Sequence, residues 1–180
     1  MTIGNYEKEI AAAKEKFEAV LRSQLERNER ITANKEDLDF SKLDKIIIGV
    51  CGGDGIGPVI TAAAQRVLEY LLEKEMKAGK VEFRVIDGLT IENRASHMQA
   101  IPDEVMSQLK ECHVILMGPT TTPKKGDPWP NIESANVAMR KALDLYANVR
   151  PVRVPEKGID WTFFRENTEG AYAVGSKGIN

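Results

Sequence analysis

The stretch KIIIGVCGGDGIGPVITAAAQRVLEYLLEK, residues 45–74, decides the fold. It opens with a continuous β-branched run, which is typical of a strand buried in a parallel sheet. The segment GGDGIGP (52–58) follows, and its glycines can supply the positive φ angles of a tight turn. Pro58 suits the first turn of a helix, which we expect to extend to about Lys77. Strand, turn and helix in this order predict the opening of an α/β domain.

The alternation continues along the chain. Apolar runs predict further strands at residues 80–88, 113–118, 146–153 and 160–167, and helices at 101–111 and from Ser134 onward. Strands alternating with helices favour parallel β-α-β units. We therefore expect an α/β fold with a largely parallel sheet and flanking helices, over residues 46–180.

Residues 1–45 differ from the rest of the chain and are expected to form a helical extension and linker. Ile10, Phe17, Leu21 and Leu25 fall at helical spacing among charged residues, which predicts an amphipathic helix from Tyr6 to Arg30. Two interpretations of this helix stay open. It packs on its own domain, or it contacts a partner or another subunit.

Composition narrows the functional classes. The chain has 180 residues, 42% of them hydrophobic, and a net charge of −2, which allows a sizeable core and argues against a general nucleic-acid binder. No apolar run reaches the ~18 residues of a membrane span, and the N-terminus lacks signal-peptide features. Cys51 and Cys112 form no C-x-x-C pair, so we expect free, buried thiols in a cytoplasmic protein.

The glycine segment allows two interpretations. A dinucleotide-binding fingerprint G-x-G-x-x-G, read from Gly53, would place Pro58 at its third glycine, and Asp87 would be the ribose-binding acid. Because a proline replaces the glycine that permits close helix–strand packing, a tight strand-to-helix turn is the favoured interpretation.

The stretch SANVAMRKALDLYANVRPVR, residues 134–153, gathers cationic and small polar groups. Ser134 is a candidate N-cap, and Asn136 and Arg140 are four residues apart, on one side of a helix. Arg150 and Arg165 follow on adjacent segments. Several guanidinium groups suit a ligand with several carboxylates. The alternative is that each arginine pairs with a neighbouring Asp or Glu.

Four motifs together resemble the isocitrate and isopropylmalate dehydrogenase family. They are GDGIGP (53–58), MGPTTTP (117–123), the stretch 134–153 and FRENTEGAY (164–172), and they occur in the family's order. The resemblance implies an isopropylmalate dehydrogenase-like fold. It also implies an oxidative decarboxylase that uses NAD or NADP and Mg²⁺ or Mn²⁺.

The resemblance also implies roles for single residues. Substrate-binding residues would be Ser134, Asn136, Arg140, Arg150 and Arg165. Thr121, with Thr122 and Asn136 as further candidates, would contact the nicotinamide end of the cofactor. Tyr172 would be the catalytic acid that protonates the enol left after decarboxylation, and a phenol needs a nearby cation to do so near neutral pH. Arg153 lies one residue past the family pattern and is expected to be structural.

Ser134 and Asn136 separate the branches of the family. Isopropylmalate enzymes have apolar residues on this helix, so a hydroxyl and an amide favour isocitrate, while homoisocitrate or a related hydroxy-diacid stays open. Two departures bear on the exact substrate. The loop KKGDPWPNIE (124–133) is longer and more polar than the family's usual form, and Met117 stands where isocitrate enzymes often have a lysine.

The resemblance also implies missing parts. The family's metal-binding aspartates, its catalytic lysine and its adenosine loop belong to a later half, and His97 and His113 do not replace them. We therefore expect this chain to be the N-terminal half of such an enzyme and to be inactive alone. We expect it to work as a homo-oligomer, a dimer, or together with a complementing C-terminal half. A non-catalytic regulatory or scaffolding subunit is the alternative.

Overall fold

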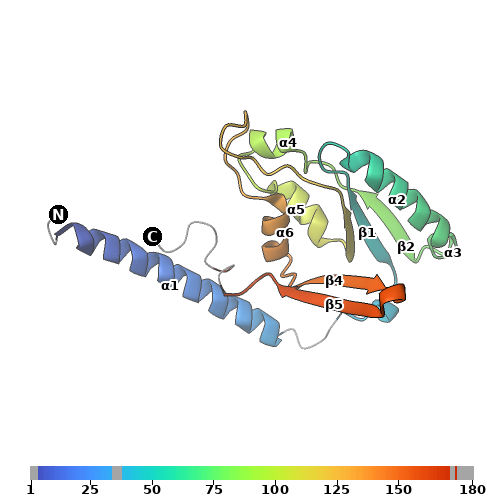
Figure 1. Ribbon diagram of the computed structural model, residues 1–180, viewed down its shortest axis with the longest axis horizontal. Coiled ribbons are helices and arrows are strands. Elements are labelled where there is room, and N and C mark those ends of the chain that lie inside the picture. The colour runs from blue at the N-terminus through green and yellow to red at the C-terminus, as the bar shows by residue number, and fades with distance from the viewer. Residues whose placement is uncertain (1–3, 34–37, 171–172, 174–180) are drawn as a thin grey trace. The chain divides into compact units, whose positions relative to one another are not determined.

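The computed structural model describes residues 4–33, 38–170 and 173 (Figure 1). The chain forms two compact units. One comprises residues 39–144, and the other joins residues 1–38 to residues 145–180. This partition groups the N-terminal helix with the C-terminal segment, which the expected boundary at residue 45 does not. Each unit is described by itself.

The unit 39–144 is built on a three-stranded parallel sheet of order β2-β1-β3. The strands are β1 (Ile46–Cys51), β2 (Val81–Val85) and β3 (Val114–Met117). In the centre, β1 pairs Ile46 with Val81 on one side and Ile48 with Val114 on the other. Its last four residues are buried. The α/β class predicted from the β-branched run is therefore confirmed.

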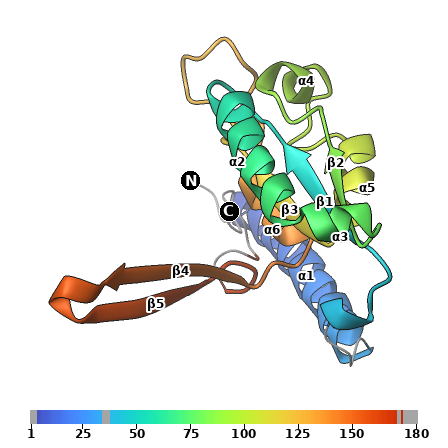
Figure 2. The ribbon, with the colours of Figure 1, turned by 90° about the vertical axis from the view of Figure 1, so that its right-hand side faces the viewer.

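Helices lie on both faces of this sheet. The helix α2 (Gly57–Leu71) lies along one face, and α5 (Asp103–Lys110) and α6 (Ala135–Ala142) lie on the other (Figures 1 and 2). The helix expected to reach Lys77 breaks at Leu72 into α2 and the short α3 (Glu73–Lys77). A further helix, α4 (Ile91–Ser96), was not predicted. It begins at Thr90, whose hydroxyl accepts the Asn93 N–H.

The core of this unit lies between the sheet and the α5–α6 layer. Val105 and Leu109 of α5 and Ala135 and Met139 of α6 are buried against Cys51, in a cluster that also contains Ile86, Leu89 and Ile101. Cys51 and Cys112 are free thiols, as expected, although Cys112 is only partly buried. Burial raises the pKa of Cys51 to about 11, with smaller contributions from Cys112 and Asp87.

The last two strands do not join the parallel sheet. β4 (Ala147–Val154) and β5 (Ile159–Glu166) pair antiparallel as a separate two-stranded ribbon, visible in Figure 2. They are joined by one 3₁₀ turn, η2 (Pro155–Lys157), and by Gly158 at φ 64°. Expecting parallel units here was wrong, because so short a connection allows only antiparallel pairing, whereas a parallel crossover needs a dozen or more residues.

The N-terminal helix, α1, runs from Gly4 to Ala33 and confirms the predicted amphipathic helix, extended at both ends. Its Arg27 donates to the Thr168 hydroxyl at 3.1 Å and to the Glu169 carboxylate at 3.0 Å, so α1 contacts the segment after β5 within the same unit. Its apolar residues stay about half exposed: Tyr6, Ile10, Phe17, Leu21 and Leu25. A short 3₁₀ turn, η1 (Phe40–Lys42), precedes β1.

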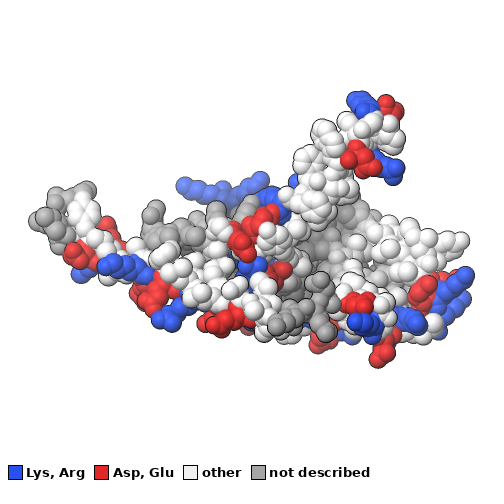
Figure 3. Space-filling model, turned by 90° about the horizontal axis from the view of Figure 1, so that it is seen from below, with Lys and Arg blue, Asp and Glu red and all other residues white. Residues whose placement is uncertain are grey.

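Over the described residues, no helix is both long and apolar enough to span a bilayer. Figure 3 shows acidic and basic side chains interspersed on the face in view, rather than gathered by sign.

Candidate functional site

The loops that follow β1, β2 and β3 meet at one edge of the sheet. The closest approach joins the glycine segment to the loop after β3, and it requires residues without a side chain. Gly53 has φ 70°, and a Cβ there would lie 2.2 Å from the Pro119 carbonyl oxygen. A Cβ on Gly118 would lie 2.1 Å from the Gly52 carbonyl oxygen. The glycines thus allow two backbones to touch, which supports the tight-turn interpretation over a phosphate cradle.

Asp54, at the tip of the glycine segment, hydrogen-bonds to the loop after β3 and to the start of α4. Its N–H donates to the Pro119 carbonyl at 2.7 Å. One carboxylate oxygen accepts the Ile91 N–H and the other accepts the Thr121 N–H, both at 2.7 Å. Sequence reasoning missed this role. An Asp between glycines is a common turn residue, and nothing local reveals its distant partners.

Arg94, in α4, is a second centre that the sequence did not reveal. Its side chain is fully buried and donates to three main-chain carbonyls, those of Ala100 (2.7 Å), Thr121 (2.8 Å) and Glu133 (3.0 Å). These carbonyls come from the loop after α4, from the loop after β3 (residues 118–123, the threonine loop) and from the segment entering α6. One guanidinium therefore connects three parts of this edge.

The helix α6 carries three of the predicted substrate residues. Ser134 occupies the N-cap position but makes no capping hydrogen bond, so its hydroxyl is not used by the helix. Asn136 makes a single weak contact, from its amide nitrogen to the Thr120 hydroxyl at 3.4 Å. Arg140 has no hydrogen bond or ion pair with the described residues. The nearby anion, Glu133, is paired with Lys141 at 3.2 Å.

The predicted cofactor residues lie in the same unit. The main chain of Thr121 is held at both its N–H and its C=O, by Asp54 and Arg94. Within the described part of the chain, neither the Thr121 nor the Thr122 hydroxyl has a hydrogen-bond partner. The backbone is thus fixed, while the hydroxyls stay available to a ligand.

Arg150 and Arg165 belong to the other unit, where the ribbon brings them together. Asn148 is paired with Arg165 across the ribbon. Because side chains alternate between the faces of a strand, Arg150 shares the face of Asn148 and Arg165. The Arg150 Nε donates to the side-chain amide oxygen (Oδ1) of Asn148 at 3.1 Å. One exposed face of the ribbon therefore carries two guanidinium groups.

The remaining candidates have other roles or lie outside the described residues. Arg153 points to the opposite face of the ribbon and pairs with Asp160 at 3.5 Å. The predicted catalytic Tyr172 lies outside the described residues. His113 precedes β3, and its Nδ1 accepts the Ile47 N–H at 3.0 Å, which is a structural contact. His97 follows α4, in contact with the Asn93 carbonyl.

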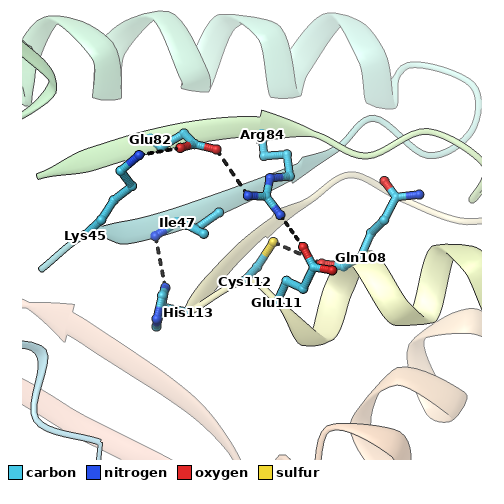
Figure 4. Close-up of polar contacts among 8 residues, drawn as sticks. All are labelled: Lys45, Ile47, Glu82, Arg84, Gln108, Glu111, Cys112 and His113. Atoms are coloured by element: carbon cyan, nitrogen blue, oxygen red, sulfur yellow. Dashed lines mark hydrogen bonds and ion pairs between the residues drawn. The ribbon is translucent and has the colours of Figure 1, made fainter. Parts of the chain in front are cut away.

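Ion pairs link β2 to its neighbours away from these loops (Figure 4). Lys45 contacts Glu82 at 3.0 Å, and Arg84 bridges Glu82 (3.2 Å) and Glu111 (2.7 Å). Hydrogen bonds from Lys45 and Arg84 hold the pKa of Glu82 below its ordinary value. Such exposed pairs add little stability, and none of these residues contacts the threonine loop.

The described residues do not offer a metal site. In the ranges 4–33, 38–170 and 173, no three His, Cys, Asp or Glu side chains are grouped as ligands. The oxygen-rich set that Mg²⁺ or Mn²⁺ requires is therefore not assembled by this part of the chain.

Comparison with known proteins places these features in a family. The profile of the isocitrate/isopropylmalate dehydrogenase family matches residues 47–180. Isocitrate dehydrogenase (NADP) of Archaeoglobus fulgidus is 40% identical over 140 residues, covering 72% of this chain and 32% of the relative. That of Haloferax volcanii is 38% identical over 154 residues, covering 81% and 35%. The chain spans about a third of the length of these curated relatives.

Solved structures agree with the sequence relatives. A β-decarboxylating dehydrogenase from Thermococcus kodakarensis matches with a TM-score of 0.54 and 33% identity, over 69% of this chain and 35% of that chain. Isocitrate dehydrogenase from Methylococcus capsulatus matches with a TM-score of 0.52 and 31% identity, over 71% and 36%. Because the family profile covers most of its length, the chain belongs to the isocitrate/isopropylmalate dehydrogenase family.

Proposed function

We propose that this chain supplies the substrate-binding groups of an oxidative decarboxylase that acts on isocitrate with a nicotinamide cofactor. The observation that carries the proposal is the set on α6. Ser134, Asn136 and Arg140 have almost no partners of their own in the described structure, and the neighbouring Glu133 is neutralised by Lys141. Polar groups left unpaired beside a fixed loop are what a polar anionic ligand requires.

Each residue has a defined task in this proposal. Arg140, Arg150 and Arg165 grip substrate carboxylates, because a guanidinium binds a carboxylate with two parallel hydrogen bonds. Ser134 and Asn136 hydrogen-bond the polar third arm of isocitrate, whereas the alkyl arm of isopropylmalate would leave them unpaired. Homoisocitrate differs less from isocitrate and is the closer competitor.

The cofactor and the proton are handled by different residues. Thr121, with Thr122 and Asn136, contacts the nicotinamide end, and the names of the relatives favour NADP over NAD. A bound nicotinamide cofactor would accept the hydride, and a divalent metal, for which the described residues offer no grouped ligands, would polarise the substrate oxygen. Tyr172 donates a proton to the enol that remains after decarboxylation. A phenol needs a nearby cation for this task near neutral pH.

The isolated chain is expected to bind but not to turn over, and to work in the cytoplasm as a dimer or with a complementing segment. Thermal unfolding with and without isocitrate tests the binding. Isocitrate should raise the midpoint, and 3-isopropylmalate should not. Arg140→Ala should abolish the shift, whereas Lys110→Ala, the same charge change at an exposed residue of α5 with no ion pair to the described residues, should keep it. An equal shift in both variants would contradict the assignment.

A non-catalytic subunit is the second candidate, and α1 is the observation that favours it. Its apolar residues at helical spacing stay about half exposed, from 45% at Ile10 to 62% at Leu25. A dehydrogenase assay with isocitrate, Mg²⁺ and NADP tests whether the isolated chain depends on other parts for turnover. Turnover by the isolated chain would contradict the expectation of dependence on other parts.

A further inference from the structure

Arg94 is the one buried charged side chain among the described residues, and it has no ion pair with any of them. Its exposed fraction is 0%, and its hydrogen bonds all go to main-chain carbonyls. Burying a charge is costly unless the group is fully hydrogen-bonded, and a neutral side chain would pack more cheaply. The arrangement therefore needs a reason beyond filling the core.

The three carbonyls indicate that reason. A guanidinium presents its donors in a rigid planar fork, so the groups that it binds are held in fixed relative positions. One of these groups belongs to Thr121, and another belongs to Glu133, which directly precedes Ser134. Arg94 thus bridges the threonine loop and the start of α6.

Asp54 binds the other polar group of the Thr121 main chain. Its carboxylate accepts the Thr121 N–H, while Arg94 donates to the Thr121 C=O. The Asp54 charge also acts on Arg94. Burial lowers the pKa of the guanidinium and Asp54 opposes this effect. Both polar groups of the Thr121 main chain are therefore engaged, and its hydroxyl is left for a ligand.

We propose that Arg94 is a positioning residue. With Asp54, it fixes the distance between the threonine loop and the start of α6. It thereby holds the proposed cofactor-binding Thr121 and the proposed substrate-binding Ser134 in fixed relative positions. The inference rests on the proposed function, because it takes Thr121 and Ser134 as ligand-binding residues. It predicts that the affinity for the substrate falls when Arg94 is changed, although Arg94 does not touch the substrate.

The test compares Arg94→Met and Arg94→Lys with the unmodified chain. Met keeps the length and loses every donor, whereas Lys keeps the charge but cannot hold three carbonyls in one plane. Asp54→Asn is a milder variant that loses one of two acceptors at nearly constant volume. Arg84→Met is the matched control, because Arg84 is a guanidinium of the same unit that contacts only Glu82 and Glu111 in the described structure (Figure 4).

Two readouts are taken at a temperature where circular dichroism shows every variant to be folded. Hydrogen exchange without ligand should accelerate in peptides spanning residues 118–136 and not in β1. The dissociation constant for isocitrate should rise about tenfold in Arg94→Met, as when groups that support a ligand site are removed. It should rise less in Arg94→Lys and Asp54→Asn, and stay unchanged in Arg84→Met.

The outcomes separate this inference from the proposed function. Faster exchange confined to residues 118–136 together with weaker binding supports positioning. Unchanged exchange overturns it, as does an unchanged dissociation constant despite faster exchange, or acceleration spread equally over β1. If the unmodified chain binds no isocitrate, the proposed function fails, and the exchange data alone decide whether Arg94 fixes the loop.

Discussion

The unit 39–144 and the β4–β5 ribbon use apolar residues in opposite ways. Among the described residues, every buried hydrophobic side chain lies between Ile48 and Met139. On the ribbon, Trp161, Phe163 and Phe164 are 60%, 55% and 72% exposed. In the ribbon's unit, the buried described residues are polar, Asn167 and Thr168, and the side-chain amide oxygen of Asn167 has no hydrogen-bond partner among the described residues. One unit has a core of its own, whereas the other offers an uncovered apolar surface.

This difference shows where stability and ligand binding reside. A two-stranded ribbon is marginal by itself in water, so its arginines are held less firmly than those on a buried framework. The groups on α6 and the threonine loop rest on the core and on the Asp54 and Arg94 contacts. Pre-organisation of the site is therefore expected to come from residues 39–144.

The largest difference in stability is expected when an apolar side chain is removed from each region. Leu109→Ala should lower the free energy of unfolding by about 2–5 kcal/mol, because Leu109 is fully buried and a cavity remains. Phe164→Ala should change it by less than about 0.5 kcal/mol, as at other exposed sites. Urea denaturation followed by circular dichroism measures both. A Phe164 variant as unstable as the Leu109 variant would mean that the ribbon is covered in solution.

A second test places the same substitution at two glycines with similar φ angles. Gly53 (φ 70°) would place a Cβ against the Pro119 carbonyl, whereas Gly158 (φ 64°), in the ribbon's turn, has open space around it. Gly158→Ala should cost about 1–2 kcal/mol, the cost of a left-handed conformation. Gly53→Ala should cost more, because the backbones must also separate. Equal losses in urea denaturation would show that the close approach is not maintained.

The sequence predicted local patterns better than distant contacts. The β-branched run before GGDGIGP specified β1 and its turn, and the residues from Ser134 onward indicated a helix with Asn136 and Arg140 on one side. The ribbon was misassigned, because apolar strands look alike whether they pair parallel or antiparallel, and only the short turn at Gly158 decides. Asp54 and Arg94 gave no signal, because their partners are main-chain groups, which every residue carries.

The buried core should be sensitive to alkaline pH. Burial raises the pKa of Cys51 from 9.0 to about 11, so the folded state holds the thiol proton more tightly than the unfolded state. The stabilisation is complete below pH 9 and is lost as the pH rises through 11. Cys51→Ala should flatten this part of the stability profile, measured by urea denaturation at several pH values. An identical slope in the variant would contradict this origin.

The stability of the ribbon's unit should fall at acidic pH because of Glu166. This is the smallest effect that we expect. Partial burial of Glu166 favours its neutral form, but hydrogen bonds from Thr168, Glu169 and Asn167 outweigh this and lower its pKa from 4.5. The contribution is present above pH 4.5 and is lost as the pH falls through the lower, folded pKa. Amide chemical shifts of Thr168 and Glu169 should follow this titration.

Glu166→Gln tests the acidic effect, because the amide still accepts a hydrogen bond but carries no charge to titrate. The amide shifts of Thr168 and Glu169 should then stay constant below pH 4.5. Glu156→Gln, an exposed change in the ribbon's turn, should leave the titration unaltered. If the shifts still move in the Glu166 variant, another acid controls this segment. The acidic sensitivity of the ribbon's unit could then no longer be assigned to Glu166, and the contrast with the alkaline sensitivity of Cys51 would be lost.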